Sequence, residues 1–119
     1  MRIIFPRTLL MKEAIGQGEK EWLLKAVSKG IYKIIKGSDL PGNSELRKLY
    51  ITTVIGPRRA VFIVNLQTKD LFFLFLRSKK DAIGQNITIK NPIFRKTLHA
   101  YLTILREDLR NKNFDSSKL

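Results

Sequence analysis

Residues 60–76 read AVFIVNLQTKDLFFLFL, and this stretch decides the fold. Two apolar runs, Ala60–Val64 and Leu71–Leu76, stand on either side of a polar connection. Both runs are short, rich in β-branched or aromatic residues and bounded by turn formers, so strands are favoured over a buried helix. Because the runs are apolar at every position, each strand is expected to be covered on both faces. The stretch therefore predicts a β-hairpin at the centre of a small sheet.

Further elements are expected on both sides of this hairpin. Strands are predicted over Met1–Phe5 and Leu46–Ile55, and Gly56-Pro57 is expected to turn the chain after the second of them. The spacing of apolar residues also indicates three helices, the last with Asn91 as its N-cap and Pro92 as its first residue. The helices are expected over Arg7–Ile15, from Glu19 to about Lys36 and from Asn91 to about Arg110, and the turn formers GSDLPGN at 37–43 separate the two halves.

This order of elements defines an α+β fold. One strand, two helices, three antiparallel strands and a final helix make a small antiparallel sheet with helices packed on it. The chain has 119 residues, which suits one domain. The domain is expected to span Met1 to Arg110, and the polar residues Asn111–Leu119 are expected to form a flexible tail.

The composition points to a polyanionic partner. The formal net charge is +13, from 23 Lys and Arg against 10 Asp and Glu, whereas solubility of a small domain needs a net charge of only about 2–8. Nucleic acid is the partner that such an excess first suggests. The alternative is that the charges only keep the protein soluble. There is no cysteine and a single histidine, so a disulfide framework and a transition-metal site are not expected, nor is a cofactor.

No membrane role is expected. No apolar run approaches the roughly 18 to 20 residues that span a bilayer. The first residues, MRIIFPRTLL, lack the apolar core and the small-residue cleavage site of a secretory signal. We therefore expect a cytoplasmic protein.

The basic residues of the second half gather where the predicted strands begin and end. In an antiparallel meander, the start of one strand lies beside the end of its neighbour. Arg58 and Arg59 are therefore expected to share one end of the hairpin with Arg77. Arg47 and Lys48 reach the same surface only if the strand register allows it. This convergence predicts a concave basic site on the sheet, with ordinary solvated charges at strand ends as the alternative.

Such a site suits phosphate chemistry. Arginine presents a planar fork of donors that binds phosphate oxygens, and fixed cations can stabilise phosphoryl transfer without a metal. If the substrate is RNA, its own 2′-hydroxyl can attack the adjacent phosphate while the protein accepts one proton and donates another. A lysine among other cations has its charged form disfavoured, which lowers its pKa toward a useful range. The lysines considered for this role are Lys48, Lys79 and Lys80.

Other catalytic schemes find less support in the sequence. His99 is the only histidine, and its neighbours suggest a surface or boundary position. There is no GxxxxGK[ST] phosphate loop and no GxSxG nucleophile turn. Most phenylalanines are expected in the core, whereas Tyr32 and Tyr50 are free to stack a base.

The order and spacing of these segments resemble the RelE/HigB-type toxins of bacterial toxin–antitoxin modules, within the wider RelE/ParE superfamily. In one branch of that family, a Leu-Gly-rich turn precedes a basic pair that starts a strand, a basic turn precedes the next strand, and an aromatic strand ends in basic residues followed by Asn-Ile. The segments that carry the resemblance are the first strand ending in Phe5, DLPGNSELRKLYI at 39–51, GPRRAVFIV at 56–64 and LFFLFLRSKKDAIGQNI at 71–87.

The resemblance implies a microbial-RNase-like fold and a metal-independent endoribonuclease that cleaves mRNA, often on the ribosome. It also implies a cognate antitoxin, commonly a helix-turn-helix protein encoded next door. This chain departs from the pattern in its Gly-rich turn, which is reduced to Gly56-Pro57, and in its long C-terminal helix. The residues that the pattern marks as catalytic are Arg47, Lys48, Arg59, Arg77, Lys79 and Lys80, and those expected to bind RNA are Arg58, Lys69 and Tyr50.

Two other functions stay open at this point. A toxin of the ParE-like branch would have the same fold but would inhibit a protein such as DNA gyrase without cutting RNA. A plain basic nucleic-acid-binding module would bind with a steep dependence on salt and without turnover.

Overall fold

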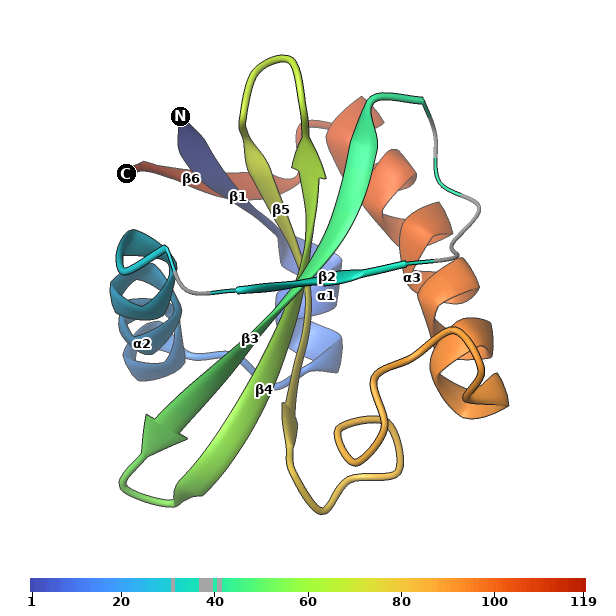
Figure 1. Ribbon diagram of the computed structural model, residues 1–119. Helices are drawn as coiled ribbons and strands as arrows, with labels where there is room; N and C mark the ends of the chain where they lie inside the picture. Colours follow the sequence, from blue (N-terminus) through green and yellow to red (C-terminus); the bar gives the residue numbers. More distant parts are fainter. Residues whose placement is uncertain (31, 37–39, 41) are drawn as a thin grey trace.

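The computed structural model describes residues 1–30, 32–36, 40 and 42–119, and these form a mixed sheet with helices on both faces (Figure 1). The strand order is β2-β3-β4-β5-β1-β6. β1 is parallel to β5, and every other neighbouring pair is antiparallel. The α+β class is therefore confirmed, whereas the expectation of a four-stranded antiparallel sheet was wrong. The sheet is mixed because β1 pairs in parallel with β5, and it has six strands because β2 and β6 extend it at its edges. The elements are β1 Arg2–Pro6, α1 Arg7–Lys12, α2 Gln17–Ser28, β2 Lys33–Ile35, β3 Ser44–Thr53, β4 Gly56–Asn65, β5 Leu71–Ser78, α3 Pro92–Arg110 and β6 Phe114–Lys118.

The central hairpin is formed by β4 and β5, as the two apolar runs predict. Its register pairs Ala60 with Leu76 and Phe62 with Phe73, with an irregularity after Val61. Successive residues of a strand point to opposite faces, and β4 accordingly supplies Val61 to one buried cluster and Phe62 to another. Both faces of the hairpin are thus covered, which is why each run is apolar throughout.

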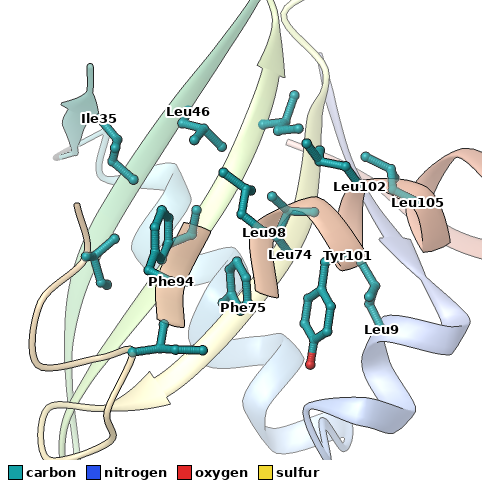
Figure 2. Close-up of a cluster of buried hydrophobic side chains, with 14 residues drawn as sticks. Leu9, Ile35, Leu46, Leu74, Phe75, Phe94, Leu98, Tyr101, Leu102 and Leu105 are labelled. Carbon is teal, nitrogen blue, oxygen red and sulfur yellow. The ribbon is translucent and has the colours of Figure 1, made fainter. Parts of the chain in front are cut away.

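One helix covers each face of the sheet. α3 packs on the face that carries Val61, where Phe94, Leu98 and Leu102 lie against the strands (Figure 2). α2 packs on the other face, and its Leu23 joins Phe62 and Phe73 there. The predicted cap of α3 is confirmed, since the Asn91 side chain accepts a hydrogen bond from the Ile93 amide and Pro92 opens the helix.

The second helix is shorter than its apolar spacing predicts. α2 ends at Ser28, Gly30 takes a positive φ of 70°, and β2 follows from Lys33. Residues 33–35 pair with β3, so this segment is a strand, and Ile35 is its buried residue. The expectation of a helix to about Lys36 was wrong, because a left-handed glycine ends the helix. Ile31 and most of the predicted turn at 37–43 lie outside the described residues.

Two further expectations needed correction. Val54 and Ile55 form the turn of the β3–β4 hairpin, whereas Gly56 (φ 114°) begins β4 and Pro57 pairs with Thr52. The end of the chain is not a loose tail, because β6 pairs with β1 along its whole length. Apart from Phe114, residues 114–118 are polar, so nothing in their pattern marks a strand. Backbone pairing and the two ion pairs of Asp115, to Arg7 at 3.0 Å and Lys20 at 2.7 Å, hold them in place.

Candidate RNA-binding site

Strand register brings four polar side chains together on the face of the sheet that α3 covers. Cross-strand partners in a sheet share a face. Lys48 lies opposite Val61, which belongs to the cluster under α3. Tyr50 lies opposite Arg59, two residues before Val61 on β4, and Lys33 lies opposite Lys48. We call this set, Lys33, Lys48, Tyr50 and Arg59, the basic row.

The ring of Tyr50 lies between two cations of the basic row. The Arg59 guanidinium carbon is 4.8 Å from the ring centroid, and the Lys33 Nζ is 5.5 Å from it. The side chain is 49% exposed, although cation–π contacts of this kind hold it in place. An exposed aromatic ring with fixed cations on both sides can stack a base and contact the adjoining phosphates.

Carbonyl oxygens of the segment between β5 and α3 orient two cations of the basic row, Arg59 and Lys48. Arg59 Nη1 donates to the carbonyls of Gly84 at 2.7 Å and Gln85 at 3.3 Å, and Lys48 Nζ donates to the carbonyl of Ile87 at 3.3 Å. A carbonyl fixes a cation without neutralising it, so the positive charge stays available to a phosphate. The segment can come this close because residue 84 is glycine, whose ideal Cβ would lie 2.0 Å from the Ser78 carbonyl oxygen.

Arg77 is the register partner of Arg59, but an internal network holds its guanidinium. Glu13, whose side chain is 1% exposed, accepts from Arg77 Nη2 at 2.7 Å and from the Tyr101 hydroxyl at 2.9 Å. Asp81 contacts Arg77 Nη1 at 3.4 Å. The Glu13 carboxylate also accepts from the Leu76 amide at 2.9 Å. The network joins the end of α1 to β5 and α3, and it makes Arg77 a structural cation.

The protonation of this network follows from its contacts. The hydrogen bond to Glu13 raises the pKa of Arg77 above its ordinary value, although burial opposes the shift. Burial raises the pKa of the Tyr101 phenol, and its hydrogen bond to Glu13 adds to the effect. Burial also pushes up the pKa of Asp81, but hydrogen bonds from the Ile83 and Gly84 amides and the charge of Arg77 prevail, so the net pKa is lowered.

The other basic residues singled out in the sequence occupy four different places. Lys79 and Arg58 line a hollow of about 250 Å³ together with Arg59 and Tyr50, so they adjoin the basic row. Lys80 is exposed just beyond β5. Arg47 lies on the opposite face of the sheet, 2.7 Å from Glu45 and with its guanidinium carbon 4.1 Å from the centroid of the Tyr32 ring. Lys69 lies in the β4–β5 connection, at the far end of the hairpin.

Sequence reasoning missed Lys33, Glu13 and Tyr101. Lys33 was assigned to a helix, and the signal that could have placed it outside a helix is Gly30, which follows the end of α2. Glu13 pairs with a residue 64 positions away, which spacing does not reveal. Tyr101 was assigned to the apolar stripe of α3, where its ring does stack on Phe75 at 4.7 Å between centroids.

Among the described residues, no cluster of three or more His, Cys, Asp or Glu could hold a metal ion. No helix in the same part of the chain is long and apolar enough to span a membrane. Comparison with protein-family models, with curated proteins and with solved structures returned no match.

Proposed function

We propose that this chain is a metal-independent endoribonuclease that cleaves mRNA, acting as the toxin of a bacterial toxin–antitoxin pair. The observation that carries the proposal is the basic row, in which an exposed tyrosine is held between Lys33 and Arg59 on a rigid sheet. Rigid elements hold reacting groups better than loops do. The resemblance in the sequence supplies the class of substrate and the partner, a helix-turn-helix antitoxin encoded adjacently.

The proposed reaction is transfer of a phosphoryl group within the RNA. The 2′-hydroxyl oxygen attacks the adjacent phosphorus, the bond to the 5′-oxygen breaks, and the products are a 2′,3′-cyclic phosphate and a 5′-hydroxyl. Arg59 stabilises the charge that builds on the phosphate oxygens, and Tyr50 stacks a flanking base. One proton leaves the 2′-hydroxyl and one is given to the leaving oxygen. Lys48 and Lys79 are the amines beside Arg59 from which the acceptor and the donor are drawn.

The test is induction in a bacterium that lacks the antitoxin, with 5′ ends of transcripts mapped within minutes. We expect new cuts inside coding regions, and we expect Arg59→Ala and Lys48→Ala each to lower the cleavage rate about 10²- to 10³-fold, as loss of one transition-state donor does. Lys69→Ala is the matched control because Lys69 lies at the other end of the hairpin.

The outcomes separate the three functions. Cuts in register with codons would place the reaction on the ribosome. Growth arrest with intact transcripts would overturn the nuclease assignment and favour a protein target. If neither growth arrest nor new cuts appear, the function that remains is that of a basic nucleic-acid-binding module. Arg77→Ala is unsuitable for this test, because it leaves the buried Glu13 carboxylate without its ion pair and so disturbs the fold.

A further inference from the structure

A groove on the α2 side of the sheet adjoins the site described so far and is lined mostly by other residues. It measures about 480 Å³ and runs between α2 and the second half of β3. Figure 1 shows α2 alongside this part of β3. The helix contributes Trp22, Lys25, Ala26 and Lys29, and the strand contributes Leu49, Tyr50, Ile51 and Thr52.

The strand wall of the groove is an open sheet edge. β2 pairs with β3 only from Leu46 to Lys48. Among the described residues, no strand pairs with Leu49–Thr53 on that side. Backbone amides and carbonyls on an unpaired edge are free to bond a ligand. The groove therefore offers polar backbone groups as well as side chains.

The groove is continuous with the surface beside the basic row. Tyr50, Ile51 and Thr52 line both the groove and the hollow that contains Arg59 and Lys79. Because no described strand pairs with the β2 side of β3 here, an extended chain bound at Arg59 can cross the strand edge and enter the groove. The two surfaces can therefore hold one polymer.

The chemistry of the groove fits a nucleic acid. Lys25 and Lys29 are exposed on α2, one turn apart, and none of the described lining residues is acidic. Trp22 is half-buried in the same wall. Two cations with an aromatic ring and an open backbone edge match the phosphates, a base and the sugar oxygens of single-stranded RNA.

We propose that this groove is a second subsite for single-stranded RNA and binds the nucleotides that flank the scissile phosphate. A base packs against Trp22, and the phosphates lie near Lys25 and Lys29. The proposal rests on the proposed ribonuclease function for the identity of the polymer. Continuity with Tyr50 and Arg59 favours RNA over an acidic peptide strand that pairs with the open edge, and the peptide becomes an outcome of the test.

Trp22 makes the test direct, because it is the only tryptophan of the chain. The full chain is titrated with a fully 2′-O-methylated oligoribonucleotide of about ten nucleotides, a length within the range that such grooves bind. This probe has no free 2′-hydroxyl, so it binds without being cut. We expect saturable quenching of the tryptophan fluorescence. Replacing Lys25 and Lys29 together by Ala should weaken binding about tenfold.

Salt dependence gives a second readout from the same titration. The slope of log K against log salt changes by roughly 0.7 for each phosphate contact of a single strand. The Lys25→Ala/Lys29→Ala chain should therefore lose about 1.4 from the slope. Lys112→Ala/Lys118→Ala is the matched control, since it removes the same charge at exposed positions next to and within β6, the opposite edge strand of the sheet.

The subsite and the ribonuclease can fail separately. Absence of quenching, an unchanged slope in the Lys25→Ala/Lys29→Ala chain, or equal quenching by poly-glutamate would overturn the RNA subsite. On cleavable RNA, a raised KM with kcat retained in that chain supports the subsite, and an unchanged KM contradicts it. If the wild-type protein cuts no RNA, the proposed ribonuclease function is wrong. The fluorescence titration still shows whether the groove binds single-stranded RNA.

Discussion

At Gly84 a side chain as small as methyl would disturb the site. An ideal Cβ would lie 2.0 Å from the backbone oxygen of Ser78, so one of the two segments must move. The Gly84 carbonyl is the acceptor that orients Arg59, so the movement reaches the basic row. We expect Gly84→Ala to lower the free energy of unfolding by about 1–3 kcal/mol and to weaken RNA binding.

Urea unfolding and RNA titration of the same samples check both parts of this prediction. Gly18→Ala is the control, because an added Cβ at Gly18 meets nothing within 4 Å and lies inside α2. It should leave RNA binding unchanged. If Gly84→Ala is as stable as the wild type and binds RNA equally well, the segment that contains Gly84 is not tightly packed against Ser78.

The Tyr101 hydroxyl gives the stability of the protein a dependence on alkaline pH. Its pKa is raised in the fold by burial and by Glu13. The neutral phenol is therefore preferred in the folded state, and its contribution is fully present below the unfolded pKa of about 10. That contribution is lost as the pH rises through the higher folded pKa.

Tyr101→Phe removes this titration and the hydrogen bond to Glu13. We expect the free energy of unfolding of the variant to be lower than that of the wild type by about 0.5–1.5 kcal/mol at pH 8. This gap between the two proteins should narrow as the pH rises above about 10. Thermal unfolding of both proteins from pH 8 to 11 measures the gap. A constant gap across this range would contradict the assigned titration.

Single residues also show where prediction from sequence ends. Arg59 and Arg77 were correctly expected to share one end of the hairpin, because the start of one antiparallel strand lies beside the end of its neighbour. Whether Lys48 reaches the same surface was left open, and the β3–β4 register places it on the face that carries Arg59. Arg77 was expected to face the same phosphate, but Glu13 binds it from another element. Charge alone does not tell whether a guanidinium is free, since its partner is set by tertiary packing.

At the scale of elements, α1 depends on a cap supplied by α3. Its own N-cap residue, Pro6, offers no side-chain acceptor. Asp108 fills this role across the molecule, since it accepts from the Thr8 amide at 2.9 Å and the Thr8 hydroxyl at 2.8 Å. Asp108→Ala leaves these donors unsatisfied. It should therefore lower the free energy of unfolding by about 1–3 kcal/mol.

Chemical denaturation of Asp108→Ala measures this loss. Glu107→Ala is the matched control, because Glu107 is the neighbouring acidic residue on α3 and is exposed. Its effect should stay within about 0.5 kcal/mol. Equal effects of the two substitutions would argue against a capping role for Asp108.

The edge strand β6 is held by a pair of cations at Asp115. The hydrogen bond from Lys20 lowers the pKa of this carboxyl, with help from Arg7 and against its burial. The ionised form is therefore preferred in the folded state. Its contribution is present above the unfolded pKa of about 3.9 and is lost as the pH falls through the lower folded pKa.

We expect the amides of β6 to exchange with solvent faster as the pH falls below about 4, after correction for intrinsic exchange rates. Asp115→Asn should raise the corrected exchange rate of the β6 amides at neutral pH. In this variant the rate should show no additional rise as the pH falls below about 4. Hydrogen exchange resolved by mass spectrometry reads β6 separately from β4. Identical pH profiles for the two proteins would show that Asp115 does not hold the strand.

Elements differ in how far the sequence predicts them. β5 and α3 were predicted closely, because an unbroken apolar run between turn formers and a long helical stripe leave little choice, whereas β4 begins four residues before its predicted run. β2 and β6 were missed, since a strand of three residues and a polar edge strand take their stability from their neighbours and carry no pattern of their own.

For the molecule as a whole, the fold class followed from the central hairpin. A hairpin that is apolar on both faces requires a layer on each side, and the helical stripes of α2 and α3 supply those layers. The continuous groove and hollow around β3 could not be predicted, because both depend on where β2 stops. Their position is a property of the assembled sheet.

The place of β1 in the sheet bears on how the chain folds during synthesis. Residues 2–6 are made long before their strand partners, which lie at 71–72 and 114–118. The β3–β4–β5 meander can pair while translation continues, whereas β1 waits for residues more than a hundred positions later. A ribosome translating this chain therefore carries an incomplete sheet until the last strand has emerged.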